Sequence, residues 1–169
     1  MRTIPDPGFP DDDGAADPDV AAALARYSSD FRPAPVLAAL AGRRLLVPVL
    51  AVLGEQAVGE TGHLVDKSSD MAAVLMAGRD GRKALPAFTG SGSLSAWNAS
   101  ARPVPVAVRL AAAAACQEGA AALLIDVAGP VRFVVEGDDL LRMAAGDVLI
   151  PVAGGHVWRP PTGEPLRTD

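Results

Sequence analysis

The chain has 169 residues, half of them apolar, and a formal net charge of −5. This is enough material for one hydrophobic core, so the length favours a single domain over two. The basic residues are scattered through an acidic chain, which excludes nucleic acid as the expected partner, because phosphate contacts need clustered Lys and Arg. No apolar stretch reaches the ~20 residues that a membrane-spanning helix needs, so we expect no membrane partner either.

Two features bear on compartment and origin. The only cysteine, Cys116, has no partner for an internal disulfide, and residues 1–13 lack the basic and apolar regions of a signal peptide. Both observations predict a cytoplasmic location. Lysine occurs only at Lys67 and Lys83, whereas Gly and Pro are abundant, which is typical of a GC-rich bacterial genome.

The chain begins with a segment that has no hydrophobic periodicity. Residues 1–16 mix Pro, Gly and Asp, and this composition predicts a disordered N-terminal tail. Asp17 and Pro18 are typical of the start of a helix, which we expect to run to about residue 29. A second, short helix is expected over residues 35–41.

The first strands follow this helical part. Residues 44–53 are rich in Leu and Val and predict a strand buried on both faces, although Pro48 favours an edge or a bulge. Residues 71–76 and 83–88 flank an Asp-Gly dipeptide at 80–81, which predicts a hairpin.

The chain then leaves the sheet through Gly and Ser. One helical turn is expected within residues 88–100, with Ser91 or Ser93 as its cap. The two prolines of residues 102–105 interrupt regular structure, and residues 106–117 form the strongest predicted helix because alanines fill it.

The remaining predicted elements are short and separated by Gly and Pro. They are a buried strand over 121–127, a turn at 128–130, a strand over 131–135, a helix over 137–145 and a strand over 147–153, followed by a Pro/Gly-rich C-terminal tail over 154–169. This order predicts one α+β domain over residues 17–153, with helices packed on a mixed sheet of about five strands.

The sequence contains no recognisable set of catalytic residues and no metal or cofactor motif. Cys116 lies near the C-terminal end of its predicted helix, where the helix dipole disfavours a thiolate, so we interpret it as a buried structural cysteine. His63 and His156 do not have the spacing of metal ligands and are expected at the surface. Asp126 ends a buried strand, and we expect its side chain to stabilise the following turn.

Residues 88–97 form the most unusual segment of the sequence. Phosphate binding is not expected there, since the Gly-Ser run lacks the Lys-Ser/Thr that ends a phosphate loop. Phe88 and Leu94 are predicted structural anchors. Trp97 either docks this turn onto the core or remains accessible beside the serine hydroxyls as part of a recognition groove.

Several stretches together resemble the SseB-type N-terminal domain, a family named for enhanced serine sensitivity. They are residues 85–89, Leu94 with Trp97, the prolines of 102–105, residues 123–126 with the 128–130 turn, and residues 140–146. The likeness covers residues 36–146, with two departures: Gly90 replaces a serine and Val127 replaces a proline. The resemblance implies an α+β domain that binds a partner or a metabolite, and it supplies no catalytic residue.

We therefore expect a non-enzymatic binding module whose partner is a protein or a small metabolite. Its predicted binding residues are Thr89, Ser91, Trp97 and Asp126, if the loops after the two strands lie side by side, with Pro130 as a further structural anchor. Two alternatives stay open: a metabolite sensor or enzyme linked to serine or sulfur metabolism, and a homodimeric scaffold with an apolar surface.

Overall fold

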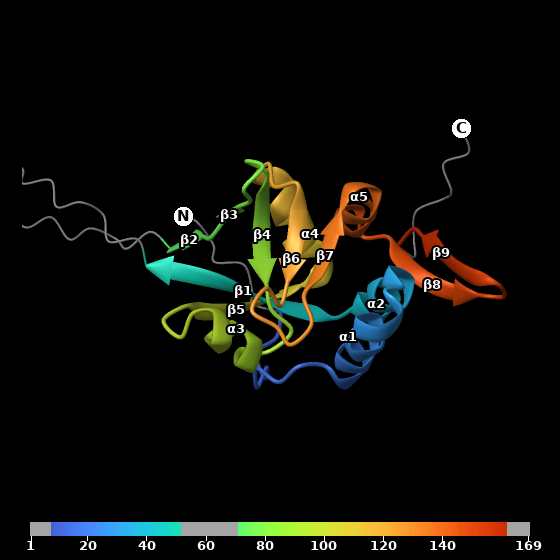
Figure 1. Cartoon of the computed structure of the whole chain (residues 1–169), viewed down its shortest axis with the longest axis horizontal. Coiled ribbons are helices and arrows are strands. Elements are labelled where there is room, and N and C mark those ends of the chain that lie inside the picture. Colours follow the sequence, from blue (N-terminus) through green and yellow to red (C-terminus); the bar gives the residue numbers. More distant parts are fainter. Residues whose placement is uncertain (1–7, 52–70, 162–169) are drawn as a thin grey trace, which may run out of the picture.

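The computed structural model describes residues 8–51 and 71–161, which contain five helices and nine strands (Figure 1). The helices are α1 (Pro18–Asp30), α2 (Pro33–Leu40), α3 (Ser91–Trp97), α4 (Val108–Gln117) and α5 (Gly137–Ala145). The strands are β1 (Arg44–Ala51), β2 (Met71–Ala73), β3 (Met76–Ala77), β4 (Lys83–Ala87), β5 (Arg102–Ala107), β6 (Ala122–Ile125), β7 (Phe133–Glu136), β8 (Val148–Val152) and β9 (Gly155–Arg159). The predicted α+β class is confirmed.

Helix α1 begins where the sequence predicts. The carboxylate of Asp17 accepts hydrogen bonds from the amides of Asp19 (2.9 Å) and Val20 (3.2 Å), and Pro18 occupies the first helical position. Val20 and Leu24 are buried on one side of this helix. A capped start and one apolar stripe are sufficient to place α1 against the core.

The strands form three sheets instead of the single sheet of about five strands that we expected. One sheet has the order β2-β1-β5 and is antiparallel, and the second has the order β3-β4-β6-β7, in which β4 and β6 are parallel. Strands β8 and β9 form a separate hairpin. In Figure 1, β4 and β6 run across the direction of β1.

Prolines explain why the two larger sheets do not merge. Leu46 of β1 exchanges both backbone hydrogen bonds with Phe88, which follows β4, at 2.8 Å each. Continued in the same antiparallel sense, this pairing would place Pro48 opposite Pro86. Neither proline has an N–H to donate, so the ladder stops at one bridge and the two sheets diverge.

The prolines at 103 and 105 lie within a strand, which corrects the expectation that they interrupt regular structure. Pro105 pairs with Leu46, whose backbone groups point away from β5 toward Phe88. Pro103 lies two positions earlier, so both missing N–H groups belong to the open edge of β5. Helix α4 consequently begins at Val108, two residues later than predicted.

Two other segments differ from expectation. Strand β3 pairs with β4 across the predicted Asp-Gly turn, but β2 pairs with β1. Residues 155–159, which the composition places in a C-terminal tail, form β9, and this strand pairs with β8 over its whole length. Half-buried residues alternate with exposed ones along β9, as is usual in a strand. The neighbouring Gly and Pro residues made this alternation difficult to recognise in the sequence.

The core lies between the four-stranded sheet and helices α1, α2, α4 and α5. Helix α4 covers one face of this sheet (Figure 1), and its alanines permit close approach. A second, smaller cluster lies beneath α3, where Leu46, Phe88 and Leu94 pack together. None of the helices within residues 8–51 and 71–161 is long and apolar enough to cross a membrane.

Candidate functional site

The loops that follow β4 and β6 lie side by side. These two strands are parallel neighbours, Ala87 pairs with Ile125, and the amide of Asp126 donates to the Ala87 carbonyl at 3.0 Å. Because parallel strands end at the same edge of a sheet, residues 88–93 and 126–130 leave it together. The edge at the carboxyl ends of parallel strands is where open α/β sheets commonly bind ligands.

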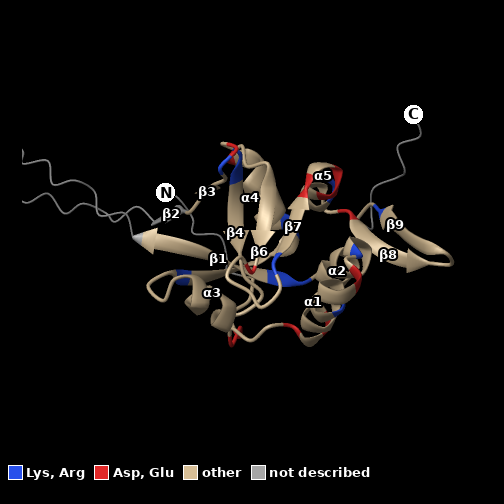
Figure 2. Ribbon diagram, in the orientation of Figure 1, with Lys and Arg blue, Asp and Glu red and all other residues tan. Residues whose placement is uncertain are grey.

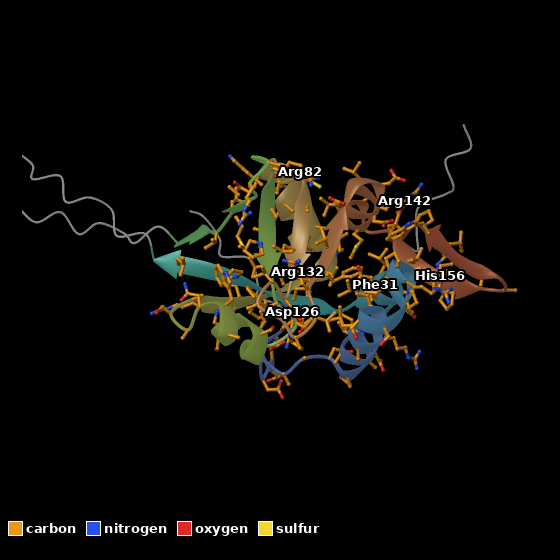
Figure 3. The ribbon with its side chains drawn as sticks, viewed as in Figure 1. Phe31, Arg82, Asp126, Arg132, Arg142 and His156 are labelled. Carbon is orange, nitrogen blue, oxygen red and sulfur yellow. The ribbon has the colours of Figure 1, made fainter. Side chains whose placement is uncertain are left out.

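A buried carboxylate joins the two loops. The side chain of Asp126 accepts a hydrogen bond from the Thr89 amide (2.9 Å), one from the Thr89 hydroxyl (2.7 Å) and one from the Ser93 hydroxyl (2.6 Å). Only 2% of Asp126 is exposed, and its φ of 50° lies in the left-handed region that Asp tolerates better than most residues. Figure 3 shows Asp126 at the end of the four-stranded sheet. Its side chain therefore ties two strand ends together, beyond the local turn that we expected it to stabilise.

A cleft of about 540 Å³ opens over this carboxylate. Its polar side chains are Thr89, Ser93 and Asp126 on the two loops and Ser28 on α1. The walls are mostly small and apolar, and they come from α1, from the N-terminal segment and from the 130–131 turn. They comprise Ala15, Ala16, Ala21, Leu24, Ala25, Pro130 and Val131. An apolar cleft with a few converging polar groups is the usual form of a ligand site.

The wall formed by residues 8–16 is held in place by Arg44. This guanidinium forms an ion pair with Asp12 and donates to the carbonyls of Ala15 and Thr89, at 2.5 Å each. The side chains of Arg44 and Asp12 are only 11% and 13% exposed. The Arg44 hydrogen bond lowers the pKa of Asp12 below its ordinary value. This described part of the predicted tail is therefore attached to the domain by specific contacts.

Gly90 fits closely beneath the same segment. A Cβ atom at this position would lie 2.9 Å from the Ala16 amide nitrogen and 3.1 Å from the Gly14 carbonyl oxygen. Its φ of −155° is extended backbone, so it is the lack of space, and not a conformational demand, that favours glycine here. The next residue, Ser91, donates its amide to the same Gly14 carbonyl at 2.7 Å. Gly90 is one of the departures from the SseB pattern, and the N-terminal segment occupies the space that a serine side chain would need.

The structure brings two of the four predicted binding residues together. Thr89 and Asp126 are in direct contact. Ser91 is exposed beside Gly14, outside the cleft lining. Trp97 is half-buried and packs on Phe88 with 5.4 Å between ring centroids, so its indole belongs to the second core cluster.

The three predicted structural anchors differ in burial. Phe88 and Leu94 are buried, whereas Pro130 is exposed and lines the cleft. Helix α3 has Gly90 at its N-cap, without a side-chain cap bond, and not Ser91 or Ser93 as expected. The reason is that Gly90 has the extended backbone of an N-cap residue, whereas Ser91 and Ser93 already lie within the helix, where the Ser93 hydroxyl donates to the Asp126 carboxylate at 2.6 Å.

Sequence reasoning missed Ser93 and Arg44 as parts of this site. Ser93 lies four residues before Trp97, on a helix too short to show a pattern. Arg44 reaches Asp12 across 32 positions, a contact that one sequence does not reveal. Cys116 and His156 are both half-buried and do not line the cleft, and His63 lies outside the described residues. Within the described part of the chain, no three His, Cys, Asp or Glu side chains are grouped as metal ligands would be.

The fold and the site define one α+β domain with a cleft at the carboxyl ends of two parallel strands. The family model of the SseB protein N-terminal domain matches residues 20–142. The chain therefore belongs to the SseB N-terminal domain family. Comparison with curated proteins found no match, and comparison with solved structures found none.

Proposed function

We propose that this SseB domain is a non-enzymatic binding module and that the cleft above Thr89, Ser93 and Asp126 takes part of a protein partner. The observation that carries the proposal is the Asp126 carboxylate, which lies beneath a mostly apolar cleft of about 540 Å³. Small alanine side chains on two walls leave room for one large apolar side chain of the partner.

The two hydroxyls at the bottom of the cleft can accept hydrogen bonds from an occupant. Each hydroxyl has a single proton, and both donate it in a hydrogen bond to the Asp126 carboxylate, at 2.7 Å from Thr89 and 2.6 Å from Ser93. Both hydroxyls then present only lone pairs to an occupant. Such acceptors suit an occupant that presents an N–H or O–H donor.

Filling the cleft tests this function without disturbing the polar network. Ala25 is exposed on α1 and lines the cleft, so Ala25→Trp places an indole within it. Ala22 is exposed on the same helix but lies outside the lining, which makes Ala22→Trp the matched control. The measurement is quantitative mass spectrometry of proteins captured by the wild type and by each variant, after circular dichroism has shown equal folding.

The proposal expects at least one protein that the wild type and Ala22→Trp capture equally and that Ala25→Trp loses. Identical profiles for the three proteins would contradict it. A cleft that instead takes a small metabolite would be detected by thermal-shift screening of serine and related metabolites, with stabilisation of the wild type and Ala22→Trp alone. That result would replace the protein partner by the metabolite-sensor alternative.

A further inference from the structure

The four-stranded sheet has a second surface, on the face opposite α4. Successive side chains of a strand point to opposite faces of the sheet. In β7, Phe133 and Val135 therefore point into the core, whereas Val134 and Glu136 are exposed on the second face. Leu124 of β6 pairs directly with Val134, and both lie on this open face. Val134 is 44% exposed on β7, the edge strand of this sheet.

This open face is hollowed at its centre. Ala84 of β4 pairs with Ala122 of β6, and these two small side chains lie beside the larger Leu124 and Val134. The resulting shallow hollow has a volume of about 580 Å³. Met76 closes it on the side of β3. The centre therefore offers apolar contact area and space for one aliphatic side chain.

Basic side chains surround the hollow. Arg79, Arg82 and Lys83 lie around the β3–β4 hairpin, and Arg132 precedes β7. Figure 2 shows the basic cluster at the tip of this hairpin, and Figure 3 shows Arg82 and Arg132 at opposite ends of the sheet.

The charges around this rim are not balanced internally. Arg82 forms ion pairs with Asp80 (2.6 Å) and Glu136 (3.4 Å), the two acidic residues of the rim. Arg79, Lys83 and Arg132 have no ion-pair partner among the residues that the structure describes. With four basic and two acidic side chains, the rim has a net charge of +2 in a chain whose net charge is −5.

We propose that this face is a docking surface for an extended acidic peptide that carries an aliphatic side chain between two carboxylates. The strand from Arg132 to Glu136 spans roughly 13 Å, at about 3.3 Å per residue. An extended peptide covers the same length with five residues, and its side chains at positions one, three and five share one face. The matching pattern is therefore Glu-x-Leu-x-Glu, with Leu in the hollow and the carboxylates at the two basic ends.

Charge complementarity and side-chain chemistry favour this occupant over a nucleic acid. Sheet surfaces that bind single-stranded nucleic acid present aromatic rings for base stacking. The side chains lining this hollow are aliphatic, charged or thioether groups. The surface goes beyond the proposed cleft function, because the two sets of lining residues have no member in common.

The test is a titration of the full chain with a fluorescently labelled Glu-x-Leu-x-Glu peptide, with Ser and Thr at the x positions, followed by anisotropy and by amide NMR shifts. The Arg79→Ala/Arg132→Ala variant removes the two ends of the rim. The matched control, Arg26→Ala/Arg109→Ala, removes two exposed arginines that also have no ion pair among the described residues.

We expect binding by the wild type and the control, an affinity loss of at least tenfold in the rim variant, and amide shifts confined to β6, β7 and the β3–β4 hairpin. A peptide with Lys in place of both Glu residues should not bind. The proposal is overturned if the acidic peptide does not bind, if both double variants lose affinity equally, or if an oligothymidylate binds the rim as tightly as the peptide. Shifts at Thr89 and Asp126 alone would also overturn it, while leaving the cleft proposal intact.

Discussion

Thr89 donates to both oxygens of the Asp126 carboxylate, with its amide bonded to Oδ1 and its hydroxyl to Oδ2, although the two residues are 37 positions apart. This pair fixes the relative position of the loops after β4 and β6. The Ser93 hydroxyl completes the network from α3. The shape of the cleft therefore depends on one buried carboxylate.

Two replacements of Asp126 should lower the free energy of unfolding by different amounts. Asp126→Ala leaves the Thr89 amide and hydroxyl without an acceptor and leaves the Ser93 hydroxyl only the Gly90 carbonyl at 3.0 Å, so we expect a loss of about 2–4 kcal/mol in the free energy of unfolding. Asp126→Asn tolerates the left-handed backbone and keeps one acceptor oxygen, so its loss should be smaller, about 1–2 kcal/mol. Urea denaturation checks both values, and equal losses for the two variants would contradict this account of the network.

Gly90→Ala should loosen the N-terminal segment without unfolding the domain. Its Cβ atom would meet backbone atoms of Gly14 and Ala16, which lack the freedom of a flexible side chain. Hydrogen exchange at the Ser91 amide, which bonds to the Gly14 carbonyl, should become faster. Gly92→Ala is the control, because a Cβ there meets nothing within 4 Å, and it should leave the Ser91 exchange rate unchanged. Equal exchange rates in both variants would show that residues 14–16 do not pack on Gly90.

Arg44 and Arg43 are adjacent in sequence but should differ in their contribution to stability. Arg44→Ala removes the ion pair with Asp12 and the bonds to two carbonyls from a largely buried position, so we expect a loss of about 2–3 kcal/mol. The Arg43 side chain is 42% exposed, and Arg43→Ala should cost under about 1 kcal/mol despite its ion pairs with Asp17 and Asp19. Thermal and urea unfolding measure both variants, and a larger loss for Arg43→Ala would reverse the expected order.

The Arg44–Asp12 pair also predicts a dependence of stability on pH. The pKa of Asp12 is lowered in the folded state from its ordinary value of 3.8. The stabilisation is therefore fully present above that ordinary value, and it is lost as the pH falls through the lowered pKa. Asp12→Asn has no carboxylate at this position, so its stability has no contribution from the protonation of residue 12. Between pH 6 and pH 3, the variant should lose less stability than the wild type in parallel urea titrations, and identical pH profiles would exclude a contribution from Asp12.

Local patterns in the sequence predicted the helices and most of the strands. Asp17 and Pro18 predicted the start of α1, and the alanines predicted α4. The arrangement into three sheets was not predictable, because it depends on Pro48 and Pro86 occupying positions that would face each other if two strands remote in sequence continued to pair. The prediction that the prolines at 103 and 105 interrupt regular structure was wrong for a related reason. A strand can contain these prolines only if it lies at the edge of a sheet, and the position of β5 at an edge is defined only by the assembled sheet.

The same distinction applies to the site. Thr89 and Asp126 were identifiable because each follows a predicted strand, and the parallel pairing of these strands brings them together. Trp97 was predicted as a binding residue because a helix of seven residues is too short for its sequence pattern to indicate which side is buried. The wall formed by residues 8–16 depends on the reach of Arg44 to Asp12, and a composition rich in Pro, Gly and Asp gives no sign of that contact.

Photocrosslinking in cells tests most directly whether the cleft is a recognition site. A benzophenone amino acid at position 25 would lie in the cleft, and the same group at position 22 would lie on α1 outside the lining. We predict a discrete crosslinked adduct from position 25 that is absent from position 22. Adducts of the same mass and yield from both positions, or none from position 25 in folded protein, would contradict the assignment of this cleft as the binding site.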